Sequence, residues 1–374
     1  MLASGIMAME AAARRARRFE GAREGLECER AEWLLIPPSA DFRWLTGAVA
    51  RSTERLVLFA LPRRGDPFCI VPRLEAAALG HECPWLELDV WDEREDPFER
   101  LERRLPLSAR PPVLVGDGLP AATLLRLAYR TDCRPAGLAL APLRAVKDAD
   151  ELALLAAAAA HADQVVEAAA DWMKPGMTER EVARFVIERF DALGDTDPWV
   201  IVASGPNAAH PHHFTSARRL VESDVVLLDL GASTGGYGSD ITRTYWLGDP
   251  PAEARKVYEV VNAAREAGIA AVRAGAASED VDRAARAVIE AAGFAREFPH
   301  RTGHGVGLEV HEPPYLVAGN RAPLAPGMVH SVEPGVYLEG RFGVRLEDLV
   351  VVENGGARRL NHAPIDPRPK HRRA

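Results

Sequence analysis

Residues 225–244 have the sequence VVLLDLGASTGGYGSDITRT, in which a continuous apolar run leads to Asp229. Such a run predicts a buried β-strand that ends in an acid. The glycines at positions 235, 236 and 238 predict a sharp turn, after which the chain returns as a second strand carrying Asp240. A hairpin of this kind places the two carboxylates face to face.

Three further candidate metal ligands follow in separate motifs. His304 is surrounded by glycines in the segment 302–307, TGHGVG, which lets the backbone approach a metal ion or a substrate closely. Glu333 and Glu347 each follow a short apolar stretch, so we expect all five side chains to converge from strands. Four carboxylates and one imidazole make a hard, mostly oxygen site that suits Mn²⁺, Co²⁺, Fe²⁺ or Zn²⁺. Carboxylates this close would repel one another strongly without cations between them.

A faint internal repeat supports this convergence. Segment 176–182 matches 275–281 at an offset of 99 residues, and segment 220–231 matches 324–335 at an offset of 104. The second match places Asp229 and Glu333 at equivalent positions. A duplicated helix-then-strand unit related by a pseudo-twofold axis would bring a carboxylate from each half to the centre, as a two-metal site requires.

Six motifs in order carry a resemblance to a known family. The chain resembles the pita-bread metallopeptidases, the family of aminopeptidase P, prolidase and methionine aminopeptidase, and most of all the proline-specific branch. The resemblance covers roughly residues 147 to 355. The motifs that match are SGPNAAHPH (204–212), DLG (229–231), YGSDITRT (237–244), HGVGLEVHE (304–312), EPG (333–335) and RLED (345–348).

The resemblance also implies the domain organisation. Segment 39–47, SADFRWLTG, looks like the opening of a creatinase-type N-terminal domain. We therefore expect an α+β protein in which a small creatinase-like α/β domain precedes a pseudo-twofold pita-bread domain. The expected boundaries are a frayed extension over 1–23, the N-terminal domain over 24–140, a linker over 141–147, the metallopeptidase domain over 148–365 and a basic tail over 366–374.

The resemblance further implies a reaction and its residues. Asp229, Asp240, His304, Glu333 and Glu347 would hold two divalent metal ions per chain, Mn²⁺ foremost, with Co²⁺ or Zn²⁺ as alternatives. A hydroxide activated by both metals would hydrolyse the bond before proline in Xaa-Pro dipeptides or at Xaa-Pro peptide N-termini. His212 and His311 are the catalytic candidates for oxyanion stabilisation and substrate binding, and Glu333 would also shuttle a proton.

Several further residues have a predicted role near this site. Thr242 and Arg345 are expected to orient the ligands, while Tyr237 could do the same or simply pack at the hairpin. Arg321 could bind the free carboxylate of a dipeptide through a bidentate pair, or lie exposed on a loop. For His210, His213 and His330 we expect packing or rim positions.

The sequence leaves some questions about function open. It does not separate a dipeptidase from an aminopeptidase, nor does it indicate which residue precedes proline. Two alternatives on the same fold are a metal-free creatinase-like amidinohydrolase and a non-enzymatic pita-bread binding module. Both are disfavoured because all five ligand positions are intact.

Composition limits the possible partners and location. The chain of 374 residues has a formal net charge of −8, which gives no broad attraction for nucleic acid. Its apolar stretches are short and interrupted by charges, so no membrane span is expected. The four cysteines show no paired spacing, and residues 1–23 lack the apolar core of a secretory signal. We expect a cytoplasmic homodimer; Met7 and Met9 are alternative translation starts.

Overall fold

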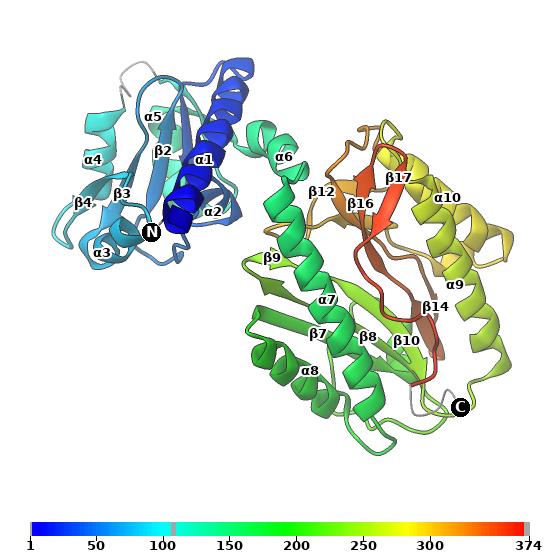
Figure 1. The fold of residues 1–374 in the computed structure, drawn as a ribbon. Helices are drawn as coiled ribbons and strands as arrows, with labels where there is room; N and C mark the ends of the chain where they lie inside the picture. Colours follow the sequence, from blue (N-terminus) through cyan, green and yellow to red (C-terminus); the bar gives the residue numbers. More distant parts are fainter. Residues whose placement is uncertain (1, 106–109, 370–374) are drawn as a thin grey trace. The chain divides into compact units, whose positions relative to one another are not determined.

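The computed structural model describes residues 2–105 and 110–369, with side chains described from residue 9 onward. The chain divides into two compact units, Met1–Arg144 and Ala145–Ala374, each coloured by its place in the sequence in Figure 1. This division falls inside the segment 141–147 that was predicted as a linker.

The first unit is an α/β domain built on a six-stranded mixed sheet with the strand order β4-β3-β2-β1-β5-β6. Strand β1 pairs antiparallel with β2 and parallel with β5. The apolar runs at 33–36, 56–59 and 112–115 form or overlap β1, β2 and β5. The strands are β1 (Trp33–Ile36), β2 (Leu58–Pro62), β3 (Phe68–Pro72), β4 (Glu87–Trp91), β5 (Pro112–Val115) and β6 (Asp132–Pro135). The helices are α1 (Leu2–Cys28), α2 (Ala40–Thr46), α3 (Arg73–Glu82), α4 (Pro97–Arg104), α5 (Ala121–Arg130) and α6 (Gly137–Ala145).

The structure shows no frayed segment over residues 2–23. They belong to α1, a helix of 27 residues that buries Phe19, Ala22 and Leu26 in the first domain. Phe19 lies 5.9 Å from the ring of Phe59. The predicted basic tail is ordered in part, because the carbonyl of Pro367 accepts a hydrogen bond from the Trp246 amide. The rest of it, from residue 370, lies outside the described residues.

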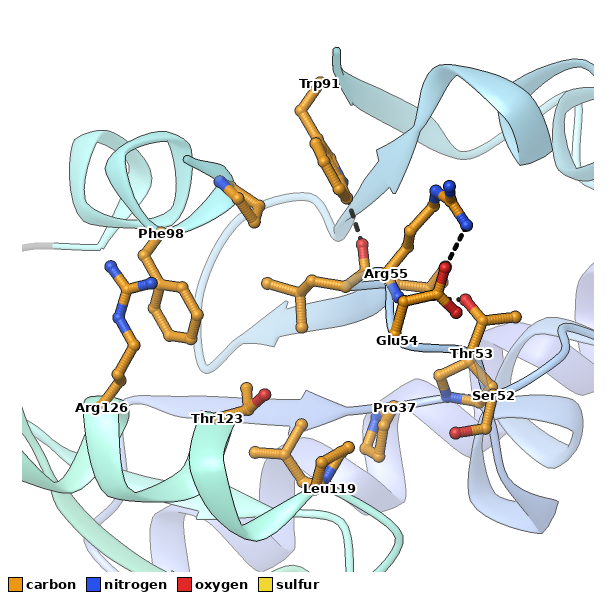
Figure 2. Close-up of a pocket in the computed structure, with 15 residues that line it drawn as sticks. Pro37, Ser52, Thr53, Glu54, Arg55, Trp91, Phe98, Leu119, Thr123 and Arg126 are labelled. Carbon is orange, nitrogen blue, oxygen red and sulfur yellow. Dashed lines mark hydrogen bonds and ion pairs between the residues drawn. The ribbon is translucent and has the colours of Figure 1, made fainter. Parts of the chain in front are cut away.

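The first domain contains a cavity of its own, of about 260 Å³, shown in Figure 2. The apolar residues that line it include Trp91, Phe98 and Leu119. The indole N–H of Trp91 donates to the Leu56 carbonyl at 3.0 Å. Arg126 at the rim pairs with Asp96 and lies 3.8 Å over the Phe98 ring. The cluster of candidate metal ligands found among the described residues lies in the second unit, as expected.

The second unit carries two smaller sheets and a hairpin. One sheet has the order β10-β8-β7 with β9 paired to β8, the other has the order β12-β11-β13-β16-β17, and β14 pairs with β15. The helices are α7 (Ala149–Trp172), α8 (Glu179–Leu193), α9 (Ala252–Ala271) and α10 (Ser278–Ala291), with the 3₁₀ helices η2 (Gly205–Ala209) and η3 (Ala295–Glu297). The strands are β7 (Thr196–Ser204), β8 (Val225–Thr234), β9 (Tyr237–Gly238), β10 (Ile241–Trp246), β11 (Gly303–Gly305), β12 (Glu312–Leu316), β13 (Val329–Val332), β14 (Gly335–Leu338), β15 (Phe342–Arg345), β16 (Asp348–Glu353) and β17 (Gly356–Arg359).

The internal repeat corresponds to two structurally equivalent turns. The Gly176 amide donates to the Leu220 carbonyl, and the Gly275 amide donates to the Leu324 carbonyl, both at 2.8 Å. These partners are related by the offsets of 99 and 104 read from the sequence. In the first half of this unit, helices α7 and α8 pack on the sheet that contains β8 and β10. In the second half, α9 and α10 cover strands that include β13 and β16 (Figure 1).

Helix α7 is long and apolar enough to cross a membrane by length and composition alone. Its buried residues, Val165, Val166 and Ala169 among them, pack into the core with Leu228 of β8 and Val186 of α8. An apolar helix with a buried face of this kind is typical of the core of a globular domain. The packing therefore accounts for the composition of α7.

Candidate metal centre

Asp229 and Asp240 are placed by the hairpin of β8 and β10. Asp229 lies in the middle of β8, and Thr242 of β10 is its antiparallel partner. Asp240 stands immediately before β10, after the glycine turn. Both carboxylates are buried, with Asp229 8% and Asp240 3% exposed. The predicted hairpin is present, but Thr242 and not Asp240 lies directly opposite Asp229.

The other three candidate ligands come from the second half of the domain. His304 lies in β11, Glu333 directly follows β13, and Glu347 lies between β15 and β16. His304 Nε2 is 3.1 Å from Glu333 Oε1 and 3.6 Å from Asp240 Oδ2. The five predicted ligands therefore converge from strands or strand ends in both halves. Ligand atoms of Asp240, His304 and Glu347 all lie within 4.8 Å of one another.

The electrostatics of this cluster favour additional positive charge among the acids. Burial and the neighbouring carboxylates raise the pKa of Asp240 and Glu347 well above their ordinary values, and burial raises the pKa of Asp229. Within the described residues, Asp229 Oδ1, Asp240 Oδ1 and Glu347 Oε1 are buried without a hydrogen-bond partner. Buried oxygens of this kind are costly unless a cation or a donor satisfies them. The donor set therefore fits divalent metal ions.

Arg345 and Thr242 hold two of the acids in place, as the sequence predicted. Arg345 Nη2 donates to Asp229 Oδ2 at 2.5 Å, and its Nε donates to Thr242 Oγ1 at 3.1 Å. Thr242 Oγ1 in turn donates to Glu347 Oε2 at 2.7 Å. Since Asp229 and Glu347 belong to different halves, these bonds fix the two halves of the site against each other.

The glycines around His304 have a different role from the one predicted. A Cβ at Gly303 would come within 2.1 Å of the Ser331 carbonyl, and one at Gly305 within 2.3 Å of the Pro313 carbonyl. Neighbouring backbone therefore excludes side chains at both positions. The glycines allow β11 to lie closely between β12 and β13, and this packing positions His304.

A cavity of about 570 Å³ opens onto the four candidate acidic ligands and His304. His212 and His311 both line it, and the His311 ring lies 4.1 Å from the ring of His304. Burial and His304 lower the pKa of His311 to about 4, so its imidazole is neutral near pH 7. The full lining is Trp199, Ile201, Pro211, His212, Asp229, Asp240, His300, Arg301, His304, His311, Glu333, Arg345 and Glu347.

Two of the predicted site residues lie elsewhere. Tyr237 is buried beneath α7, where its hydroxyl donates to Glu151 Oε1 at 2.6 Å, so it packs at the hairpin. Arg321 is 87% exposed and lies 3.5 Å from Glu279 Oε1, outside the cavity. The prediction that it binds a substrate carboxylate in this cavity is wrong, because the loop after β12 points its side chain toward α10.

Several residues at the site were not predicted from the sequence. Tyr337 accepts from Arg345 Nη1 at 2.8 Å, and its hydroxyl lies 2.8 Å from His300 Nε2. Arg301 lies 4.4 Å over the Tyr315 ring and faces the cavity. His300 and Arg301 immediately precede the TGHGVG motif, and that proximity is the one signal that could have identified them.

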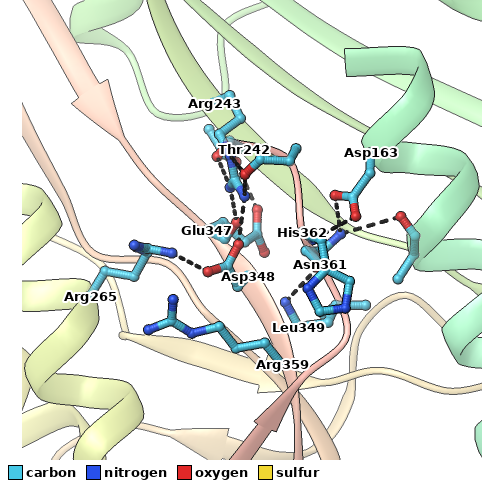
Figure 3. Close-up of polar contacts among 12 residues, drawn as sticks. Asp163, Thr242, Arg243, Arg265, Glu347, Asp348, Leu349, Arg359, Asn361 and His362 are labelled. Atoms are coloured by element: carbon cyan, nitrogen blue, oxygen red, sulfur yellow. Dashed lines mark hydrogen bonds and ion pairs between the residues drawn. The ribbon is translucent and has the colours of Figure 1, made fainter. Parts of the chain in front are cut away.

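A buried network of charged residues lies next to Glu347 in the chain (Figure 3). The adjacent Asp348 accepts from Arg243 Nη2 at 2.7 Å through one oxygen and from Arg265 Nη1 through the other. Arg243 Nη1 also donates to the Glu347 carbonyl. Arg265 continues outward to Glu266 at 2.6 Å. The start of β16 is thus tied to β10 and α9 at the residue beside a candidate ligand.

Comparison with known proteins identifies the family. Residues 153–354, more than half of the chain, match the model of metallopeptidase family M24. The chain belongs to this family, and its catalytic unit has the pita-bread fold.

Similar proteins cover nearly the whole chain. A probable dipeptidase PepE of Mycobacterium tuberculosis is 41% identical over 338 residues, which are 88% of this chain and 90% of that protein. The crystal structure of dipeptidase PepE from Mycobacterium ulcerans superposes with a TM-score of 0.90 at 40% identity, covering 95% of this chain and 98% of the other. A prolidase from Thermococcus sibiricus has a TM-score of 0.89 at 35% identity, with 94% and 98% covered. The two-domain organisation is shared with these peptidases.

Proposed function

We propose that this M24 peptidase is a two-metal exopeptidase that hydrolyses Xaa-Pro bonds, with dipeptides as its preferred substrates. The observation that carries the proposal is the set of buried, unpartnered carboxylate oxygens of Asp229, Asp240 and Glu347 at the floor of one cavity. His304 and Glu333 complete the donor set. Similarity to a prolidase and to PepE dipeptidases supports the choice of substrate.

The divalent ions, when bound, would supply a water of lowered pKa for attack on the scissile carbonyl. Glu333 lies at the cavity with its Oε1 fixed by Ser331 Oγ at 3.0 Å, and it would pass a proton to the leaving nitrogen. His212 and His311 line the cavity and would donate hydrogen bonds to the substrate carbonyl as negative charge develops on its oxygen. An Xaa-Pro bond has no N–H group to donate a hydrogen bond. The enzyme must therefore recognise the substrate through its carbonyl, its termini and the proline ring.

Arg301 is the residue that would bind the free C-terminal carboxylate of a dipeptide. It lines the cavity, and within the described residues its guanidinium has no carboxylate partner, whereas Arg345 is engaged by Asp229. Stacking on Tyr315 holds the guanidinium while leaving its N–H groups free for a bidentate pair with a carboxylate. The free C-terminal carboxylate of the proline residue in a dipeptide substrate is the group that fits it.

The first test combines metal and substrate. Chelated protein should lose hydrolysis of an Xaa-Pro dipeptide, and Mn²⁺ or Co²⁺ should restore it, with about two ions bound per chain by elemental analysis. Full activity in protein shown to be metal-free would contradict the proposal. Hydrolysis of non-proline dipeptides at equal rates would remove the proline preference and leave a general dipeptidase.

Two variants separate ligands from substrate-binding groups. Asp240→Ala should lower metal content and activity together, because it removes a ligand. His311→Ala should keep its metal and lose mainly turnover. If His311→Ala also emptied the site, His311 would have to be placed among the ligands.

A further inference from the structure

Glu179, at the start of α8, is buried at the centre of a polar cluster outside the metal centre. Its Oε1 accepts from the Ser204 amide at 2.9 Å, the Ser204 hydroxyl at 2.7 Å and Asn207 Nδ2 at 2.9 Å. Its Oε2 accepts from the Ser216 amide at 2.9 Å and the Ser216 hydroxyl at 2.7 Å, and lies 2.9 Å from His213 Nε2. The side chain is fully buried. One carboxylate thus binds both ends of the segment 204–216.

This segment carries His212 into the cavity. Within it, the Pro211 carbonyl accepts from Arg345 Nη1 at 3.2 Å. The Ala208 carbonyl lies so close to Gly343 of β15 that a Cβ there would be 2.0 Å away. The segment is therefore held against the metal centre on one side and tied to Glu179 on the other. Loss of either set of contacts would free His212 to move.

The internal repeat shows that the turn itself does not require a carboxylate. Ser278 is the residue of the second half at the offset of 99 from Glu179. The Glu179 amide donates to the Arg218 carbonyl and the Ser278 amide to the Ala322 carbonyl, both at 3.0 Å, so the backbone is alike in both halves. The Ser278 hydroxyl simply donates to the Ala322 carbonyl at 3.0 Å. The glutamate is present in the half whose following segment carries His212.

The environment keeps Glu179 ionised. Burial opposes the charge, but the hydrogen bonds from Ser216, Ser204, Asn207 and His213 outweigh it and lower the pKa to about 2. Arg218, the nearby guanidinium, is committed to Asp224 at 2.6 Å and to the Ser204 hydroxyl at 2.7 Å. A charged acceptor that collects this many donors makes stronger bonds than a neutral one.

We propose that Glu179 is a positioning residue that holds the segment 204–216, and through it His212, in place for substrate. The inference rests on the proposed function in one respect, the role of His212 in binding the substrate carbonyl. Glu179 itself does not line the cavity. It would act on turnover through the geometry of His212 alone.

The decisive experiment is a double-mutant cycle in the metal-loaded, full-length enzyme. Glu179→Gln replaces one accepting oxygen with an amide that faces donors, and should lower kcat/KM roughly tenfold to hundredfold with metal content unchanged. In the His212→Ala background the same change should cost less than about twofold, because the residue it positions is gone. Equal losses in both backgrounds would overturn the proposal.

Hydrogen exchange gives a readout that does not depend on activity. Glu179→Gln should speed exchange of the Ser204 and Ser216 amides, which donate to Glu179, while amides of β8 stay protected. Unchanged exchange at these amides would contradict the proposal even if activity fell. If the wild-type enzyme hydrolysed no proline peptide, the proposed function would fail while this exchange result would still stand.

Two further variants complete the design. Glu181→Gln is the matched control, because Glu181 lies on the same helix but is exposed, and among the described residues its carboxylate accepts hydrogen bonds from Thr178 alone. It should leave kcat/KM and the exchange of Ser204 and Ser216 unchanged. Should Glu179→Gln fail to fold, Ser216→Ala removes one donor and should give the same effects at smaller size. A Ser216→Ala enzyme with wild-type exchange and turnover would refute the role of Glu179.

Discussion

Arg301 and Arg321 are close in sequence, yet one faces the cavity and the other faces solvent. Losing a bidentate pair with a substrate carboxylate in a partly desolvated site costs about 2 kcal/mol, roughly thirtyfold in kcat/KM. We therefore expect Arg301→Ala to lower hydrolysis of an Xaa-Pro dipeptide by about that factor. An Xaa-Pro tripeptide, whose carboxylate lies one residue further on, should be affected far less.

Arg321→Ala is the control for this prediction, since it removes an equally charged side chain outside the cavity. Steady-state kinetics on both peptides for both variants provide the measurement. Arg301→Lys should recover little activity because lysine lacks the planar fork. Equal losses on the dipeptide and the tripeptide would show that Arg301 does not read the C-terminal carboxylate.

At the scale of an element, strand β16 contains two acidic residues with very different surroundings. Asp348 at its start is buried between Arg243 and Arg265, whereas Glu353 at its end forms an exposed pair with Arg358. Asp348→Asn leaves two buried guanidinium groups without their shared negative partner. It should lower the free energy of unfolding by about 3 to 5 kcal/mol. Glu353→Gln should cost about 0 to 1 kcal/mol.

Urea unfolding of chelated protein provides this measurement, because metal loss then does not enter the comparison. Similar losses for the two variants would mean that the buried network adds no stability beyond a surface pair. If Asp348→Asn lost activity but not stability, the role of Asp348 would be to position Glu347 and not to stabilise the fold.

At the scale of the whole molecule, the acids of the metal centre link stability to pH. In metal-free protein the pKa of Asp240 and Glu347 is raised, so folding takes up protons at these groups. Their favourable contribution is present at low pH and is lost as the pH rises through the raised pKa. Metal binding needs the deprotonated ligands, so its stabilising effect grows over the same range.

We expect Mn²⁺ to raise the melting temperature more at about pH 8 than at about pH 5, when each is compared with chelated protein at the same pH. Differential scanning calorimetry on both forms tests this. Asp240→Ala should reduce the pH dependence of the shift. A metal-induced shift that is the same at both pH values would mean that these acids are ionised in the metal-free protein.

Sequence alone determined the parts of this protein that depend on local pattern. The β8 to β10 hairpin, the turn repeated at an offset of 99, and the order of the five candidate ligands follow from apolar runs and glycine turns. These features can be predicted from the sequence because the residues that form each of them are close together in the chain. The convergence of the acids also followed, since the repeat implied a pseudo-twofold axis.

Tertiary structure alone decided which other side chains reach the site. Tyr337 and His300 meet through folding, Arg301 rather than Arg321 enters the cavity, and Glu179 collects donors from a segment more than twenty residues away. Residues 2–23 form part of a packed helix for the same reason, because Phe19 and Ala22 are buried by distant residues. Sequence periodicity indicates which face of an element is buried but not which distant residue it contacts, so these contacts could not be predicted from the pattern.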